Sequence, residues 1–285
     1  MTKRRKYIVP ASLGALIQEY RASPEYDRLA PGTKVGYQLA LGRLEPLYRV
    51  GVDEIRRRHI ITLRNRYRDR PGAANQIVAV VGVLMKLAVD LEYRDGVLSG
   101  IKKLPVGEYR RWADQDVAYA LKNFPEHLRR AVILALYTGQ RSDDLAAMTW
   151  SAYDGEGISL TQQKTGVKLW LPCHPVLGGE LAAWKPTASA VTILTGAKGR
   201  PFLNKSLANA TYREIASHQQ LDGLVFHGLR KTAAAKLAEA GCSTHEIASI
   251  TGHKSLQMIE HYTTGADQVR RAKAAIFKLQ ENASY

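Results

Sequence analysis

Cysteine is scarce in this sequence of 285 residues, which contains only Cys173 and Cys242. The two lie far apart, and neither belongs to a C-x-x-C pattern. This spacing excludes a disulfide-rich scaffold and argues against a structural zinc site. It also favours a reducing compartment, so we expect a cytoplasmic protein.

Long apolar runs are missing as well. The most apolar stretch, Ile77 to Leu91, is interrupted by Lys86 and is shorter than the roughly 20 residues that cross a bilayer. The basic N-terminus, MTKRRKYIVP, is not followed by the apolar segment of a signal peptide. We therefore expect no membrane-spanning segment and no membrane partner.

Acidic residues are too few to balance the basic ones. The chain has 26 Asp and Glu against 41 Lys and Arg, which gives a formal net charge of +15. The excess is largest in residues 1–107, where 20 basic residues face 10 acidic ones. Such a balance is typical of proteins that bind a polyanion, most often nucleic acid, so we expect a nucleoid-associated protein. A basic protein without such a partner is the alternative.

Periodicity and turn residues divide the chain into two domains. Residues 12–94 show helical periodicity, and we predict a helical domain over residues 1–95. Glycine and proline then interrupt residues 96–111, which we interpret as a linker. A second domain follows over residues 112–285. The first domain has four predicted apolar stripes: residues 13–20, residues 35–44 (Val35, Leu39, Leu41, Leu44), residues 55–63 with Asp53 as the cap, and residues 73–91.

Arginine is concentrated in one part of the first domain, where acids are almost absent. Seven arginines fall within fifteen residues: Arg56, Arg57, Arg58, Arg64, Arg66, Arg68 and Arg70. A solvated helix surface is the simpler interpretation, but this density exceeds what solubility needs. We expect these side chains to contact DNA phosphates, which positions a protein on the duplex and reads little sequence.

The second domain begins with a helical pattern from Asp114 and continues with a helix over residues 126–137. Arg141 follows in a turn, and Ser142 or Asp143 is the predicted cap of the next helix. Residues 157–172 then alternate between apolar and polar positions around Lys164-Thr165-Gly166. This pattern predicts a β-hairpin with Lys164 at or beside its tip.

The stretch from Phe226 to Thr263 has the highest density of chemically capable side chains. His227 and Arg230 are three residues apart at the start of a helical pattern, and His253 and Tyr262 follow. Each of these residues alone is more often structural than functional. Together, two imidazoles, a guanidinium and a phenol suit a phosphodiester, whereas nothing in the set suits a metal or a nucleotide cofactor.

The chain resembles the tyrosine site-specific recombinase (phage integrase) family in six residues that occur in the family's order. They are Arg141 in TGQRSDDL, Lys164 in QQKTG, His227 and Arg230 in HGLR, His253 in TGH, and Tyr262 in EHYT. The resemblance covers about residues 112–265 and includes an acidic position after the first arginine, Asp144. Each motif is weak alone, and their common order makes the set specific.

The resemblance implies a mainly α-helical fold with a small β-hairpin. A helical core-binding (SAM-like) domain and a catalytic domain would form a C-shaped clamp around double-stranded DNA. Partners would be inverted half-sites, with a dimer on one site, a tetramer in synapsis, and accessory DNA-bending or directionality proteins. The helix expected after Gly265 would pack on a neighbouring protomer.

The resemblance also implies catalytic roles. Tyr262 would attack a scissile phosphate and form a 3′-phosphotyrosyl link, while Arg141 and Arg230 bind its non-bridging oxygens. Lys164 would protonate the leaving 5′-oxygen. His227 is the expected proton acceptor for the phenol, and His253 is expected to bind the phosphate, although the two could exchange roles. Asp144 would orient Arg141, and no metal or other cofactor is required.

Two other functions remain open on the sequence. Residues 232–262 also fit a helix-turn-helix, with Gly241 in the turn, which would make the chain a non-catalytic DNA-binding regulator. The same six residues also suit a type IB topoisomerase-like nickase that acts without site preference.

Overall fold

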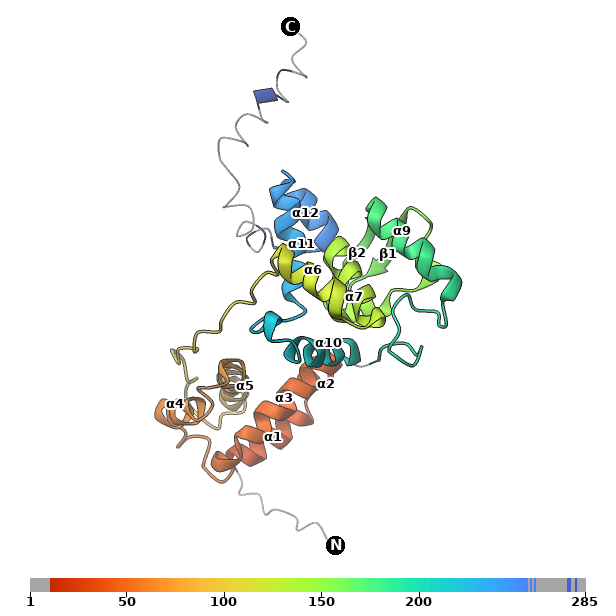
Figure 1. Cartoon of the computed structure of the whole chain (residues 1–285). Coiled ribbons are helices and arrows are strands. Elements are labelled where there is room, and N and C mark those ends of the chain that lie inside the picture. The colour runs from red at the N-terminus through yellow and green to blue at the C-terminus, as the bar shows by residue number, and fades with distance from the viewer. Residues whose placement is uncertain are drawn as a thin grey trace. The chain divides into compact units, whose positions relative to one another are not determined.

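The computed structural model describes residues 11–203, 205–255, 257, 259, 276, 277 and 280. The chain forms two compact units, residues 1–107 and residues 108–285, and their boundary falls within the stretch we interpreted as a linker. The structure is mainly helical with a single two-stranded sheet among the described residues, as the fold class predicts (Figure 1). Most of the tail helix expected after Gly265 lies outside the described residues.

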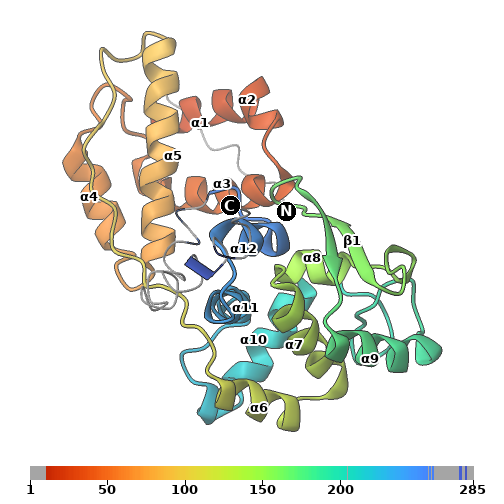
Figure 2. The same ribbon diagram turned by 90° about the horizontal axis from the view of Figure 1, so that it is seen from above.

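The first unit is built from helices. They are α1 (Leu13–Arg21), α2 (Pro24–Asp27), α3 (Pro31–Arg43), the 3-10 helix η1 (Glu45–Leu47), α4 (Arg57–Asn65) and α5 (Pro71–Asp90). Ser12 and Ser23 accept hydrogen bonds from the first turns of α1 and α2, and proline occupies the first turn of α2, α3 and α5. Helix α5 packs against α1, α3 and α4 (Figure 2).

Helix α5 begins six residues before the apolar stretch Ile77 to Leu91 from which we judged whether a segment could cross a bilayer. It has 20 residues, and by length and composition alone it is apolar enough to cross a membrane, contrary to our expectation. Ile77, Val80, Leu84 and Ala88 are nevertheless fully buried in the core of the first unit. A helix whose apolar stripe packs against three neighbouring helices is accounted for as a core helix.

Two predictions for the first unit are wrong in detail. Val35 and Leu39 are 55% and 57% exposed, because they lie on the opposite side of α3 from the buried Leu41 and Leu44. The predicted stripe therefore mixed two faces of one helix. Asp53 does not cap α4, which begins at Arg57.

The second unit contains α6 (Asp114–Asn123), α7 (Glu126–Thr138), α8 (Ser142–Ala147), η2 (Trp150–Ala152), β1 (Gly157–Thr161), β2 (Lys168–Pro172), α9 (Pro175–Trp184), η3 (Lys185–Thr187), α10 (Ser206–Ala216), η4 (Gln219–Leu221), α11 (Gly228–Glu239) and α12 (Thr244–Thr251). Strands β1 and β2 form the predicted antiparallel hairpin, in which Ile158 pairs with Leu171 and Leu160 with Leu169. Helix α7 packs against α6, α8, α9 and α11.

The segment that enters the second unit is fastened to α11. Trp112 is buried, and its backbone N–H donates to Thr232 Oγ1 at 2.8 Å while its indole N–H donates to the Val225 carbonyl at 2.9 Å. A side chain at Gly228 would collide with the backbone of Arg110, so this close approach requires glycine there. The start of α11 is thus held both by the entering segment at Arg110 and Trp112 and by its own packing in the core.

Candidate active site

Arg230 is held in the interior at the start of α11. Its side chain is buried, and its Nη1 donates to the carbonyl of Gly139 at 2.7 Å. Gly139 ends α7 with a φ of 62°, a left-handed conformation that favours glycine, and this turn aims its carbonyl at the guanidinium. Burial of a charged group is costly unless it is hydrogen-bonded, so these contacts fix the position of Arg230.

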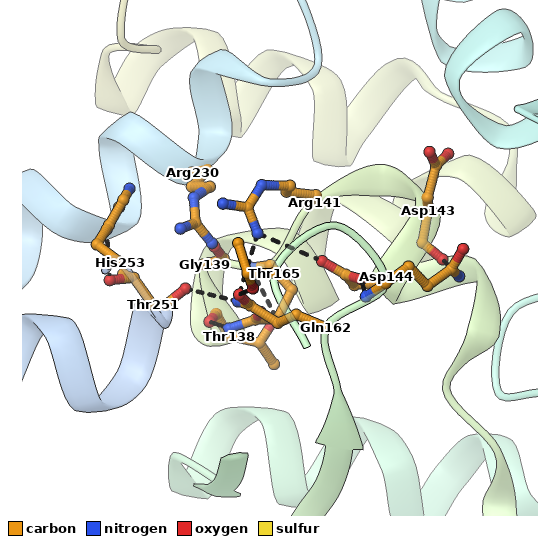
Figure 3. Close-up of polar contacts among 12 residues, drawn as sticks. Thr138, Gly139, Arg141, Asp143, Asp144, Gln162, Thr165, Arg230, Thr251 and His253 are labelled. Atoms are coloured by element: carbon orange, nitrogen blue, oxygen red, sulfur yellow. Dashed lines mark hydrogen bonds and ion pairs between the residues drawn. The ribbon is translucent and has the colours of Figure 1, made fainter. Parts of the chain in front are cut away.

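Arg141 lies two residues after Gly139, directly before α8, and its guanidinium points into the same space as that of Arg230 (Figure 3). Its Nη1 donates to Gln162 Oε1 at 3.1 Å and lies 3.7 Å from Asp144 Oδ2. The other carboxylate oxygen of Asp144 accepts from the backbone N–H of Gln163 at 2.8 Å. Asp144 therefore connects Arg141 to the hairpin loop, whereas the sequence suggested only an orienting or capping role.

Both imidazoles lie beside this positive charge. The pKa of His253 is lowered to about 4 by burial and by the charges of Arg230 and Arg141. The pKa of His227 is also lowered, first because neighbouring atoms desolvate the ring and then because of Arg230, Arg141 and Lys164. His227 directly precedes α11, and His253 lies two residues after the end of α12. The start of α11 and the end of α12 therefore bring the two imidazoles together. Both rings are neutral at pH 7.

The tautomer of His253 follows from a short hydrogen-bond chain. Thr251 Oγ1 donates to the carbonyl of Ile247, so it must accept from His253 Nδ1, which lies 2.7 Å away. Nε2 of the neutral ring is then a proton acceptor. A hydrogen bond from Nε2 to a phosphate oxygen requires the ring to take up a proton, which a nearby phosphate anion would favour.

Lys164 is exposed in the loop between β1 and β2, as the hairpin pattern predicted. Its charge contributes to the lowered pKa of His227, so the loop lies within electrostatic range of the imidazole. The structure thus brings Arg141, Arg230, His227 and His253 together and places Lys164 near them. Tyr262 lies outside the described residues.

Several residues of the site were not singled out on the sequence. Gln162 is fully buried beneath Arg141, and Tyr109 lies against His227 in an edge-to-face contact with ring centroids 5.5 Å apart. The sequence did contain an indication of Gln162 that we did not use. Alternate residues of a strand face the same side, so Gln162 follows Ile158 and Leu160 on the inward side, where a polar side chain is unexpected. Tyr109 had none, since its contact depends on tertiary packing.

The seven arginines of the first unit do not all have the same surroundings. Six are exposed and Arg64 is partly buried. Arg57 Nη2 donates to the Gly100 carbonyl at 2.9 Å, and Arg64 Nη1 donates to the Lys102 carbonyl. These two side chains hold the stretch after α5 against α4, which is a structural role that we did not predict.

Among the described residues, no group of three or more histidine, cysteine, aspartate or glutamate side chains is placed to hold a metal ion. The positive charge of the described site comes from its arginine and lysine side chains.

Lowering the pH from 7 to 5 is expected to destabilise the protein, in part through His253. Its pKa is about 4 in the folded protein, whereas an exposed histidine titrates near 6.5. Between these values the unfolded chain binds more protons than the folded one, so stability falls as the pH drops. Thermal melting should show a smaller loss of Tm over this range for His253→Gln than for the parent. Equal losses would contradict the burial of a neutral imidazole.

Comparison with known proteins identifies relatives of this chain. A sequence profile of the phage integrase family matches residues 112–268. The integrase of Escherichia phage HK022 is 31% identical over 172 residues, which are 56% of this chain and 48% of that protein. The integrase of Escherichia phage lambda is 26% identical over 245 residues, which are 74% of this chain and 64% of that protein. The chain thus spans about half to two-thirds of the length of these relatives.

Solved structures show the same fold. A lambda integrase(75-356) dimer bound to a COC′ core site superposes with a TM-score of 0.77 and 23% identity, covering 90% of this chain and 97% of that chain. A lambda integrase tetramer bound to a Holliday junction gives a TM-score of 0.73 and 23% identity, covering 86% of this chain and 78% of that chain. Since the family profile covers more than half of the residues, this chain belongs to the phage integrase family.

Proposed function

We propose that this protein is a site-specific DNA recombinase that cleaves and rejoins strands through a 3′-phosphotyrosyl link at Tyr262. The observation that supports this most is that Arg141, Arg230 and His253 lie close together, with His227 within electrostatic range of both arginines. Such a site binds an anion, and its two proton acceptors suit the activation of a nucleophile. The biological setting we propose is integration or excision of a phage or another mobile element.

In the proposed reaction the phenolic oxygen of Tyr262 attacks the scissile phosphorus. The bond from phosphorus to the 5′-oxygen breaks, and a 3′-phosphotyrosyl ester and a 5′-hydroxyl result. The phenol has a reference pKa of about 10, so it must lose its proton to a neighbouring base. His227 and His253 are both neutral at pH 7 and both able to accept that proton. We assign it to His227, which is the more exposed of the two residues.

The other side chains stabilise the negative charge that develops on the phosphate and on the leaving oxygen. Arg141 and Arg230 offer planar sets of N–H donors to the non-bridging oxygens, where negative charge grows in the transition state. Lys164 donates a proton to the leaving 5′-oxygen, and its loop position lets it approach the DNA. The energy of the broken bond is kept in the phosphotyrosyl ester, so the reverse reaction with another strand's 5′-hydroxyl needs no ATP and no metal.

We further propose that the substrate is double-stranded DNA with inverted half-sites. A dimer would bind one site and a tetramer would hold two sites in synapsis, with accessory DNA-bending or directionality proteins as possible further partners. Support comes from the related lambda integrase, which has been solved as a dimer on a core site and as a tetramer on a Holliday junction. The net charge of +15 agrees with a DNA partner, which would make the protein cytoplasmic and nucleoid-associated.

The exposed arginines of the first unit are proposed to contact the phosphate backbone. Arg56, Arg57 and Arg64 each donate to a backbone carbonyl, those of Asp53, Gly100 and Lys102. We therefore assign most of the phosphate contacts to the other four arginines, which are exposed: Arg58, Arg66, Arg68 and Arg70. Arg56, Arg57 and Arg64 still add positive charge to the first unit.

Covalent capture of DNA tests the proposal directly. The protein is incubated, in the presence of EDTA, with duplexes in which randomised segments flank a fixed nick, and protein-linked DNA is recovered after denaturation and sequenced. We expect adducts that resist denaturation, disappear with protease, and are enriched in inverted half-sites.

The other outcomes identify the alternatives. Enriched sequences that bind without any adduct would support the DNA-binding regulator. Adducts without sequence enrichment, together with relaxation of supercoiled plasmid, would support the nickase. Strict dependence on a divalent ion would contradict the proposed reaction.

A further inference from the structure

The amide of Gln162 makes four hydrogen bonds to parts of the site that are far apart in sequence. Its Oε1 accepts from Arg141 Nη1 at 3.1 Å and from Thr165 Oγ1 at 2.6 Å. Its Nε2 donates to Gln140 Oε1 at 2.7 Å and to the carbonyl of Thr251 at 2.8 Å. A glutamine amide has two donors and two acceptor lone pairs, so its full capacity is used (Figure 3).

The orientation of this amide is determined by its partners. A guanidinium can only donate and a backbone carbonyl can only accept, so the oxygen must face Arg141 and the nitrogen must face Thr251. The side chain is fully buried, where an unpaired amide is costly. A shift of any one partner therefore disturbs the others.

The four partners belong to three different elements of the site. Arg141 is the first arginine, and Thr165 follows Lys164 in the hairpin loop. Thr251 ends α12, and the next two residues are Gly252 and His253. The backbone of Gln162 also closes the loop, since its N–H donates to the Val167 carbonyl at 2.9 Å and its carbonyl accepts from Gly166 at 2.8 Å.

Gly252 shows how closely α12 approaches this amide. It has a φ of 69°, and a Cβ placed there would lie 2.5 Å from Gln162 Nε2. Both the left-handed backbone and the contact require glycine. Gln140, which receives one bond from Gln162, donates in turn to the Ile250 carbonyl at 2.8 Å, so α12 is held at two successive residues.

We propose that Gln162 is a positioning residue that couples Arg141, the Lys164 loop and the turn before His253, so that the three are in place together for DNA cleavage. This proposal rests on the function proposed above. Because Oε1 is shared between Arg141 and Thr165, the loop and the first arginine have one common acceptor. A purely structural glutamine would stabilise the fold without linking the chemistry of these groups.

The test uses Gln162→Met, which keeps the approximate volume and removes all four bonds. Gln163→Met is the matched control, because the neighbouring exposed amide donates to the Asp143 carbonyl and does not contact Arg141. Single-turnover cleavage of a duplex selected by covalent capture should slow by about 10- to 100-fold for Gln162→Met, since a hydrogen bond to a charged group is lost. Non-covalent binding of the same duplex should change by less than about threefold, as it depends mainly on phosphate contacts elsewhere.

A double-mutant cycle separates coupling from simple damage. If Gln162 acts through Arg141, then Arg141→Lys combined with Gln162→Met should cost much less than the product of the two single effects. Gln162→Glu keeps the acceptors for Arg141 and Thr165 but removes the donors to Gln140 and to the Thr251 carbonyl. It should therefore retain the direct link to Arg141 and disturb the contacts that hold the end of α12.

A second readout does not need cleavage. The imidazole C–H resonances of His253 report its titration. We expect its pKa to move upward toward 6.5 in Gln162→Met, because loss of the bond to Thr251 lets water reach the ring, but not in Gln163→Met. If the parent protein forms no adduct, the proposed function fails, and this titration still decides whether Gln162 couples the site. The proposal would be overturned if the pKa of His253 were unchanged in Gln162→Met. It would also be overturned if the rate effects of Arg141→Lys and Gln162→Met multiplied in the double mutant.

Discussion

Tyr262→Phe is expected to abolish formation of the covalent protein–DNA adduct and to leave DNA binding intact. Phenylalanine keeps the ring and removes only the attacking oxygen. Loss of the nucleophile should lower the cleavage rate by at least about 10⁴-fold, as removal of a nucleophile does in other covalent mechanisms. Adduct formation on a captured duplex and a mobility-shift titration with the same duplex measure the two properties separately.

Tyr109 supplies a matched control for this experiment. Its ring lies against that of His227, so it is a second phenol beside the proposed site, and it is 55% exposed. Tyr109→Phe keeps the ring contact and should retain adduct formation. If Tyr262→Phe still formed the adduct and Tyr109→Phe did not, the nucleophile would have to be reassigned to Tyr109.

Arg141→Ala is expected to lower the cleavage rate by about 10²–10³-fold, because a preorganised donor to the transition-state charge is worth roughly 3–4 kcal/mol. The guanidinium is held by Gln162 and Asp144 before any substrate arrives, which keeps the reorganisation cost low. Single-turnover rates on the captured duplex give the effect. Arg141→Lys keeps the charge without the planar set of donors, so it should recover only part of the rate.

Arg141 offers a clearer test than Arg230. Its side chain is 21% exposed, so truncation leaves no large buried cavity, whereas Arg230 is buried and holds the Gly139 carbonyl. A normal cleavage rate in Arg141→Ala would remove this residue from the mechanism. A large fall in Tm would instead show that Arg141 acts chiefly on the fold.

The parts of the site that depend on local pattern were predictable from the sequence. Alternation of apolar residues around Lys164 predicted the hairpin, because a strand has one inward face. Helical periodicity over residues 126–137 predicted α7 to within one residue, and Gly139 ends the helix in the left-handed conformation. Arg141 was correctly placed in the turn that follows.

Residues whose role depends on tertiary contacts were predicted less well. Ser142 and Asp143 are both good caps, yet α8 begins at Ser142 and its N-cap position is Arg141 without a side-chain bond. Thr244 is also a plausible cap in the sequence, but the side chain of Ser243 caps α12. Helix α9 was not predicted, because residues 175–205 show no clear periodicity; Leu177, Leu181 and Trp184 are nevertheless buried and offset the low helix propensity of Gly178 and Gly179.

The contacts that assemble the site connect distant residues, and no local pattern encodes them. Gln162 bonds to the carbonyl of Thr251, 89 positions away, and Arg230 bonds to Gly139, 91 positions away. The order of six residues indicated which side chains are candidates for the site. It did not indicate that one buried amide would lie between three of their elements.

The covalent bond itself gives the most direct test of the proposed chemistry. The captured adduct is denatured and digested with protease, and the peptide that remains on the DNA is sequenced by mass spectrometry. We expect the DNA to be attached through its 3′-phosphate to the peptide that contains Tyr262. Attachment to any other residue, or through a 5′-phosphate, would contradict a phosphotyrosyl recombinase that uses this site.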